Sequence, residues 1–328
     1  MTRIIDFPNQ NSALRPITLA EFIGQKRAVD ILASAVTAAR RRMEPLDHVL
    51  LQGPPGLGKT SLAAIIAADM RGRFRQLSGP MLQRAVDMAA ILASVEENDV
   101  VFIDEIHRAH PAALEMTYTA MEDFRLDMTV GTGLQTRSVS LPLPRFTLIG
   151  ATTRAGQLPR PMRERFGLNL TLELYGEAEM IEILLRSSRL LALDMDRDVA
   201  RLCAARCRGT PRVANALLRR LRDMADNTGR TTVDRNLAIA CFDLLGLDDK
   251  GLEARERAYL ACLAKRFRGG PVGIEALAAA LGIETTTIEE DIEPWLVHAG
   301  FVERTARGRI LGPLAGANSD VDLFAETP

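Results

Sequence analysis

The segment Gly53–Thr60, with the sequence Gly-Pro-Pro-Gly-Leu-Gly-Lys-Thr, has the residue types and spacing of a phosphate-binding loop. It follows a short apolar run at 48–52 and precedes a strongly helical run. Glycines at these points let backbone N–H groups and the helix N-terminus face phosphate oxygens. Lys59 can then reach the outer phosphates, and the Thr60 hydroxyl can bind Mg²⁺. A turn that is only rich in glycine does not explain Lys-Thr at this point, so the sequence predicts a nucleotide site.

Two adjacent carboxylates, Asp104 and Glu105, follow the apolar run Val100–Ile103. Ligands of open α/β sheets bind outside the carboxyl ends of the strands. We expect Asp104 to orient a metal ion and its water, and Glu105 to polarise an attacking water. Paired acids at the end of a strand are usually just a solvated terminus. Beside a phosphate loop, the catalytic interpretation is the stronger one.

The elements that must position these groups follow from the periodicity of apolar residues. Short apolar runs at 48–52, 100–103 and 146–149 alternate with helical patterns, which is typical of an α/β fold with a parallel sheet covered on both faces. A segment at about 127–141, rich in β-branched residues around a glycine-containing turn, is expected to form an inserted hairpin. These elements predict one large domain over residues 1–175.

Beyond residue 175 the strand pattern disappears. Amphipathic helices are expected at roughly 177–192, 196–207, 211–226 and 233–246, which predicts a small helical domain over 176–248. Short helices and then two strands joined by a glycine turn predict a winged-helix domain over 249–311. The last stretch, 312–328, is rich in Gly, Pro, Asp and Ser, and we expect it to be disordered.

The composition limits the classes of protein that this chain can be. Its 328 residues suggest two domains of about 150 residues each, or three small ones. The formal net charge of −1 creates no global field toward nucleic acid, so any DNA contact must be local. The four cysteines lack the spacing of metal ligands and are expected to be buried thiols in a reducing compartment. Since no apolar run approaches the length of a membrane span, we expect a cytoplasmic protein without a membrane partner.

The two nucleotide motifs resemble those of the AAA+ ATPases. That family adds a polar sensor residue at the end of a later strand, an arginine finger from a neighbouring subunit, and a second arginine on a helical lid domain. On this resemblance Thr153 takes the position of the first sensor and Arg165 that of the finger. Arg212 takes the position of the lid arginine, which is called sensor 2.

A closer resemblance is to the RuvB family of bacterial Holliday-junction branch-migration motors. It extends from about Leu14 to Arg309 and consists of similar motifs in the same order. These motifs are Leu14–Pro16, Phe22–Gln25, Leu46–His48, Gly53–Thr60, Asp104–Arg108, Ala120–Phe124, Phe146–Gly156, Arg208–Arg212, Gly269–Gly273 and Arg304–Arg309.

The resemblance implies a set of nucleotide-binding residues for ATP or ADP. Leu14 and Arg15 would bound the adenine pocket, and Tyr175 and Arg212 would close it. The phosphates would be held by Gly56, Gly58, Lys59, Thr60 and Ser61, with Thr60 and Asp104 at the Mg²⁺ ion. Glu122, Asp123 and Phe124 would form a further contact with nucleotide.

The resemblance also implies the activity and the partners. It predicts a homohexameric ring that hydrolyses ATP to move along duplex DNA and to drive branch migration of four-way junctions. Such migration serves recombination, DNA repair and the SOS response to DNA damage. The family works with a RuvA-type junction-binding protein and a RuvC-type resolvase.

Two surfaces are predicted to contact these partners. Arg304 and Arg309 flank a glycine turn and could both reach one phosphate backbone; the alternative, of about equal weight without the resemblance, is a solvated hairpin. In the hairpin at about 127–141, Met128 and Val130 alternate with polar residues and present an apolar face. The resemblance assigns this face to the RuvA-type partner, whereas a simpler interpretation packs it on its own domain.

Three positions depart from the family's pattern, and two other functions stay open. Thr285 stands where the family is expected to carry a DNA-contacting arginine, the segment 78–87 lacks a charged pair followed by glycine, and the residues from Gly312 onward differ. A divergent paralogue, or an AAA+ remodeller or loader acting on a protein through its winged helix, is therefore an alternative. A non-motor nucleotide switch is disfavoured, because it needs neither Glu105 nor Arg165.

Overall fold

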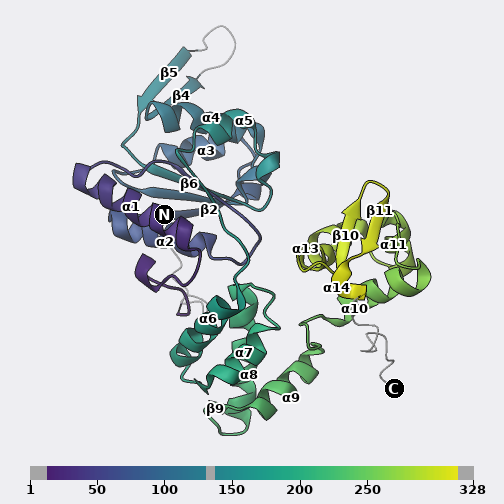
Figure 1. Cartoon of the computed structure of the whole chain (residues 1–328). Coiled ribbons are helices and arrows are strands. Elements are labelled where there is room, and N and C mark those ends of the chain that lie inside the picture. Colours follow the sequence, from purple (N-terminus) through teal and green to yellow (C-terminus); the bar gives the residue numbers. More distant parts are fainter. Residues whose placement is uncertain (1–12, 131–136, 317–328) are drawn as a thin grey trace. The chain divides into compact units, whose positions relative to one another are not determined.

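The computed structural model describes residues 13–130 and 137–316. Their contacts divide the chain into two compact units (Figure 1). The first comprises Met1–Leu191 and Gly209–Ala216, and the second comprises Ala192–Arg208 and Leu217–Pro328. The second unit contains most of the helical segment after residue 191 and the winged-helix region.

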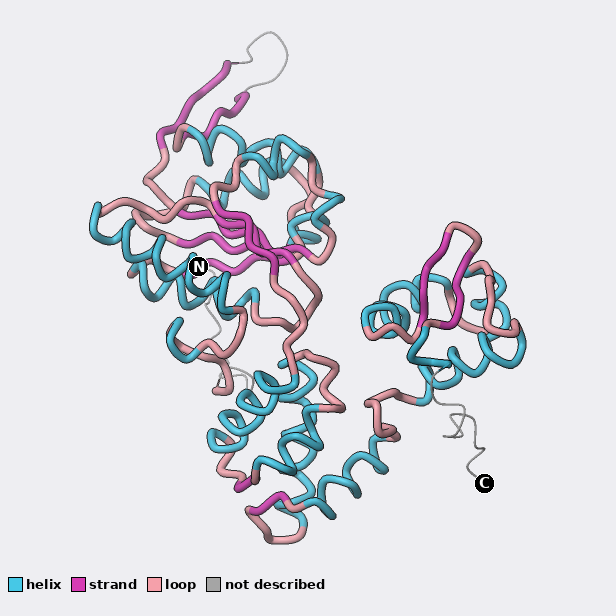
Figure 2. The backbone as a smooth tube through the Cα atoms, viewed as in Figure 1, coloured by secondary structure: helices cyan, strands magenta, loops and turns pink. Residues whose placement is uncertain are grey.

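The first unit is built on a parallel sheet, which has five strands in the described part of the chain. The strand order is β2 (Phe74–Ser78), β3 (Val100–Asp104), β6 (Thr147–Thr152), β1 (Val49–Gln52) and β7 (Leu168–Thr171). Figure 2 shows helices on both faces of this sheet. They are α1 (Lys26–Arg42), α2 (Lys59–Met70), α3 (Ala85–Leu92), α4 (Pro111–Glu122) and α5 (Arg160–Glu164). The first unit also includes α6 (Glu177–Leu190). Short 3₁₀ turns lie at Leu19–Glu21, Gly79–Met81, Ile106–Arg108 and Ala155–Gln157. The predicted α/β fold is confirmed.

The burial of each strand explains which strands the sequence revealed. β3 and β6 are buried along almost their whole length, as expected for inner parallel strands with apolar side chains on both faces. β2 and β7 lie at the two edges of the sheet and are more polar and more exposed, so their patterns did not predict strands. Because the strands are parallel, the carboxyl ends of β1, β3 and β6 meet at one edge of the sheet.

An antiparallel hairpin, β4 (Arg125–Val130) and β5 (Arg137–Pro142), is inserted before β6. Met128 is half-buried: part of its side chain packs against the core between the sheet, α3 and α4, and part stays exposed. The side chain of Val130 lies outside the described residues. Within the described part of this hairpin, the exposed apolar side chains are Val139 and Leu141 on β5, which pair with Met128 and Leu126. They share a face with Met128 because alternate residues of a strand point the same way.

The second unit begins with a helical segment. It contains α7 (Arg197–Ala204), most of α8 (Pro211–Asn227), α9 (Arg235–Leu245), and a short parallel pair, β8 (Asp194–Met195) with β9 (Thr232–Val233). The sequence analysis did not predict the strand pair, which is only two residues long.

The C-terminal segment has its own hydrophobic core. It consists of α10 (Ala254–Ala261), α11 (Ile274–Leu281), α12 (Thr285–Thr287), α13 (Glu293–His298) and α14 (Pro313–Gly316), together with the antiparallel wing β10 (Val302–Thr305) and β11 (Gly308–Leu311). π-helical turns at Cys262–Arg266 and Ile288–Ile292 continue α10 and α12.

The expected disorder from residue 312 onward is wrong for its first part. Gly312 is buried, its N–H donates to the Phe301 carbonyl at 2.8 Å, and α14 follows it. A side chain at Gly312 would meet the Gly300 carbonyl, so the chain can turn here only with glycine. Residues 317–328 lie outside the described part.

Among the described residues, no helix is both long and apolar enough to cross a bilayer. The four cysteines form no disulfide; Cys203, Cys207 and Cys241 are buried and Cys262 is partly buried. Burial raises the pKa of the Cys203 thiol to about 12. The expectation of buried thiols is confirmed for Cys203, Cys207 and Cys241 and not for Cys262.

Candidate nucleotide-binding site

The phosphate-binding loop joins β1 to α2 at the edge of the sheet where the inner strands end. Gly56 and Gly58 have φ angles of +82° and +103°, which only glycine adopts without strain. A Cβ atom at Gly56 would lie 2.8 Å from the Cβ of Arg212 and from the methyl group of Thr210. The loop therefore needs glycine both for its curvature and for its close contact with the segment 209–212.

Lys59 is buried within this loop. Its ammonium group donates hydrogen bonds to the carbonyls of Gly53 and Pro54, both at 2.8 Å. Burial lowers the pKa of Lys59, whereas the charges of Glu105 and Asp104 act to raise it. The lysine charge is thus held at the loop and faces the two carboxylates that the sequence singled out.

The two carboxylates lie at the end of β3. Asp104 is partly buried, and its Oδ1 accepts a hydrogen bond from the N–H of Glu105 at 3.1 Å. Burial raises the pKa of the Asp104 carboxyl, as does the charge of Glu105, while Lys59 and Arg212 lower it. A nearby cation stabilises the charged form of a carboxylate that burial has partly desolvated.

Glu105 is joined to the first-sensor residue. Its backbone is in the left-handed region, with φ at +47°, which turns the side chain toward the end of β6. There Oε2 accepts hydrogen bonds from the N–H of Thr153 at 3.2 Å and from its hydroxyl at 3.0 Å. The structure thus brings together two residues that lie 48 positions apart and that the sequence analysis selected independently.

His107 is a member of this cluster that the sequence analysis missed. Its Nδ1 lies 3.1 Å from Oε2 of Glu105 and 2.9 Å from the hydroxyl of Thr152. Burial lowers the pKa of His107, although Glu105 acts to raise it. The available signal was its place two residues after Glu105, in the turn Ile106–Arg108.

Tyr175 connects the loop to the start of α8. Its hydroxyl donates to the Leu57 carbonyl at 3.1 Å, and its N–H donates to the Gly209 carbonyl at 2.9 Å. The N–H of Arg212 lies 3.4 Å from the Gly56 carbonyl. Tyr175 and Arg212 therefore both lie against the phosphate loop.

Leu14 and Arg15 are held by a residue that the sequence did not indicate. Arg186 on α6 donates to the Leu14 carbonyl at 3.0 Å and to the Arg15 carbonyl at 3.5 Å. Arg186 also pairs with Glu21 at 3.2 Å. The Leu14 side chain is buried and the Arg15 side chain is exposed.

Arg165 and Glu122 form an ion pair of 3.2 Å. The guanidinium group also donates to the Pro161 carbonyl at 2.7 Å and lies 4.3 Å from the centre of the Tyr118 ring. These contacts hold the finger candidate between α4 and α5. Asp123 is exposed and pairs with Arg125 at 3.4 Å, and the half-buried Phe124 packs against the core of the sheet domain.

The two wing arginines have an intramolecular partner that the sequence did not reveal. Arg304 and Arg309 are directly opposite each other on β10 and β11, and both reach Glu293 on α13, at 2.6 and 2.9 Å. The Glu293 side chain is completely buried and also accepts from the Tyr259 hydroxyl at 2.8 Å. Arg309 is only 15% exposed, whereas Arg304 is 46% exposed and Arg307 is exposed at the turn. The predicted joint reach to one phosphate backbone therefore competes with a structural ion pair, most strongly for Arg309.

Thr285, which stands where the family is expected to carry a DNA-contacting arginine, is half-buried at the start of α12.

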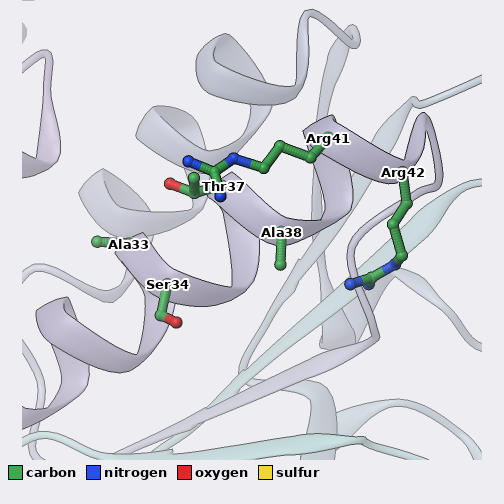
Figure 3. Close-up of a pocket in the computed structure, with 6 residues that line it drawn as sticks. All are labelled: Ala33, Ser34, Thr37, Ala38, Arg41 and Arg42. Atoms are coloured by element: carbon green, nitrogen blue, oxygen red, sulfur yellow. The ribbon is translucent and has the colours of Figure 1, made fainter.

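A shallow hollow on α1, shown in Figure 3, is lined by Ala33, Ser34, Thr37, Ala38, Arg41 and Arg42. No residue of the phosphate loop lines this hollow, so it is not part of the nucleotide site.

A parallel sheet with a phosphate loop after β1, an Asp-Glu pair after β3 and a threonine after β6 defines a P-loop ATPase domain. Residues 14–172 match the family model of the Holliday junction DNA helicase RuvB P-loop domain. Residues 175–248 match the RuvB AAA lid domain, and residues 249–317 match the RuvB C-terminal winged helix domain.

The chain belongs to the RuvB family of AAA+ ATPases, which bind nucleotide. It is similar to the Holliday junction branch migration complex subunit RuvB of Paramagnetospirillum magneticum, with 48% identity over 99% of this chain and 96% of that protein. It is also similar to the solved structure of the Thermotoga maritima RuvB Holliday junction branch migration motor. That structure has 43% sequence identity and a TM-score of 0.83, and the match covers 96% of this chain and all of that one. A substituted form of the Thermotoga protein matches with a TM-score of 0.84. The predicted family is confirmed.

Proposed function

We propose that this chain is an ATP-driven DNA translocase that powers branch migration of Holliday junctions in recombination and DNA repair. The observation that carries the proposal is the convergence of Lys59, Asp104, Glu105 and Thr153 at one sheet edge, in a chain similar to RuvB along its whole length. The ring is a homohexamer, and its partners are four-way junction DNA, a RuvA-type protein and a RuvC-type resolvase. It acts in the cytoplasm, where chromosomal DNA and ATP are both present.

The residues at the sheet edge fit a Mg²⁺ ion bound with nucleotide. Thr60 supplies a hydroxyl at the start of α2, and Asp104 supplies a carboxylate whose charge is partly desolvated. Hard oxygen ligands of this kind, together with phosphate oxygens, are those that Mg²⁺ prefers. When bound, the ion neutralises the charge that develops on the phosphates.

Glu105 is placed to activate the attacking water. Thr153 and His107 hold its Oε2, and within the described residues Oε1 makes no hydrogen bond. Oε1 can therefore accept the water proton while the water oxygen bonds to the γ-phosphorus and the bond to the β-phosphate oxygen breaks. Lys59 stabilises the outer phosphates, and Gly56, Gly58 and Ser61 complete the loop.

Other roles follow from the family and from the placement of single residues. Arg165 reaches the nucleotide of the adjacent subunit after it leaves Glu122. The adenosine end of the nucleotide is surrounded by Leu14, Arg15, Tyr175 and Arg212. The ATPase domain comprises residues 1–175, the lid domain residues 176–248 and the head domain residues 249–311.

The decisive experiment is migration of a synthetic four-way junction with ATP and Mg²⁺, with and without a RuvA-type protein. We expect migration that the partner stimulates, and ATP turnover that duplex DNA stimulates. Glu105→Gln is the control, since it should bind ATP without turnover. If a protein substrate stimulates turnover while junctions stay in place, the chain is an AAA+ remodeller instead.

A further inference from the structure

Two consecutive residues with positive φ angles, Arg208 at +53° and Gly209 at +60°, join the segment after α7 to α8. A non-glycine residue adopts this conformation only where the surroundings impose it. The segments on the two sides of the peptide bond between them are held by different parts of the chain.

The segment from Gly209 onward is packed on the nucleotide loop. A Cβ atom at Gly209 would lie 2.8 Å from the Tyr175 carbonyl oxygen, and one at Gly56 would lie 2.8 Å from Thr210. Tyr175 in turn is bonded to the Leu57 carbonyl. A shift of the phosphate loop therefore cannot occur without a response at Gly209, because closely packed backbone has no room to absorb it.

The side chain of Arg208 points to a different place, the beginning of the winged-helix head. Its two terminal nitrogens donate to the two carboxylate oxygens of Glu256 on α10, at 2.7 and 2.8 Å. Its Nε donates to the Gly251 carbonyl at 2.9 Å. The pair is largely shielded from water, with 15% of the Arg208 side chain and 4% of the Glu256 side chain exposed.

The carboxylate that binds Arg208 also caps the first helix of the head. Oε2 of Glu256 accepts the N–H of Glu253 at 2.9 Å, which is the reciprocal bond of a capping box. Arg206 adds a second contact, to Asp249 at 2.6 Å, and a Cβ atom at Gly251 would lie 2.8 Å from its backbone. The orientation of Arg208 and that of α10 are thus coupled.

We propose that Arg208 is the positioning residue that couples the nucleotide loop to the DNA-binding head. One peptide bond joins Gly209, whose backbone packs on the loop, to Arg208, whose guanidinium group binds α10. A bidentate arginine–carboxylate pair has a defined geometry, so it transmits rotation as well as translation. The proposal rests on the proposed function, because it needs a head that binds DNA.

The test compares the DNA affinity of the full-length protein in two nucleotide states. Fluorescence anisotropy with a labelled duplex gives the affinity in ADP and in a non-hydrolysable ATP analogue. Their ratio measures the coupling, which in allosteric proteins is typically about 5- to 150-fold. We expect Arg208→Gln to bring the ratio to unity and to abolish stimulation of ATP turnover by DNA. Basal turnover and the KM for ATP should stay as in the parent.

Two further variants separate coupling from simple loss of structure. Glu256→Gln keeps a side chain that can serve in the capping box but removes the charge, and should also abolish the coupling. Arg208→Lys keeps the charge but not the paired donors, and should retain only part of the coupling. Arg220→Gln, which breaks an exposed pair with Asp223 on α8, is the matched control and should leave the ratio unchanged. If Arg208→Gln does not fold, Glu256→Gln and Arg208→Lys provide the test.

The outcomes distinguish this proposal from the proposed function. A folded Arg208→Gln or Glu256→Gln protein with the parental ratio would overturn the coupling role and leave the proposed function intact. A parallel fall of melting temperature, basal turnover and DNA affinity, with the ratio preserved, would show a structural role and also overturn it. If duplex DNA does not stimulate ATP turnover in the parent, and the parent binds DNA equally well in both nucleotide states, both proposals fail.

Discussion

Removal of the buried Glu293 carboxylate should destabilise the winged-helix head strongly. Glu293 is completely buried, and its two oxygens receive hydrogen bonds from Tyr259, Arg304 and Arg309. It connects α13 to α10 and to both strands of the wing. Glu293→Ala leaves all three donors without this acceptor, so the network is disrupted rather than exchanged for an apolar one.

The expected loss can be worked out from the exposure of each partner. Breaking a buried ion pair by removing one partner costs about 3–5 kcal/mol. Arg304 contributes little, about 0–1 kcal/mol, because at 46% exposure water can solvate it. Arg309 is 15% exposed, and the one acidic partner that it keeps among the described residues is the half-exposed Glu289 at 3.3 Å. The buried Tyr259 hydroxyl loses its acceptor, at a cost of about 1–3 kcal/mol. Since Arg309 and Tyr259 carry most of the loss, it should lie in the range of about 3–5 kcal/mol for a broken buried pair, which corresponds to roughly two to three and a half powers of ten in an opening equilibrium.

Native-state hydrogen exchange of the β10 and β11 amides measures this opening directly within the full-length protein. Tyr259→Phe should cost only about 1 kcal/mol, because it removes one neutral donor and leaves the ion pairs. Glu303→Ala, at an exposed position on β10, is the control and should stay within about 0.5 kcal/mol of the parent. If the wing amides are as well protected from exchange in Glu293→Ala as in Glu303→Ala, the buried carboxylate does not stabilise the head and the reasoning is refuted.

Three further predictions concern the first unit. His48 accepts the Leu148 N–H at Nδ1, lies 3.1 Å from the Met121 carbonyl at Nε2, and has its pKa lowered by burial from 6.5, so the unfolded chain binds the proton first. His48 should therefore contribute a fall in stability below pH 6.5 of at most about 1.4 kcal/mol per pH unit, measured as the difference in slope between urea titrations of the parent and of His48→Gln; equal slopes in the two proteins would contradict this origin. Arg165→Ala and Lys59→Ala, each inactive alone, should recover some ATP turnover when mixed under conditions of subunit exchange; no recovery despite exchange would favour a role for Arg165 within its own subunit. Val139→Asp with Leu141→Asp should leave basal turnover and ring formation intact while abolishing migration stimulated by a RuvA-type partner, and parental stimulation would show that the exposed apolar face of the hairpin is not the docking surface.

The sequence by itself determined the features that depend on neighbouring residues. The phosphate loop is recognisable because its glycines, Lys59 and Thr60 must lie at fixed spacing within one short stretch of chain for the backbone to surround a phosphate. Asp104 and Glu105 were predictable because ligands of open α/β sheets bind at the carboxyl ends of the strands, whereas Thr153 was assigned by the resemblance to the AAA+ ATPases. The inner strands were predictable from their apolar runs, whereas the edge strands β2 and β7 were not, since partial exposure removes that pattern.

Only the tertiary structure decided which polar side chains pair across long distances in the sequence. Arg304 and Arg309 were selected as candidates for DNA contact, yet packing of the wing on α13 places both at Glu293. Arg208 belonged to a recognised motif, but its pairing with Glu256, 48 residues later, depends on how α10 packs. The desolvation that makes such a pair specific arises only when the core around it has formed, and no local spacing of residues encodes it.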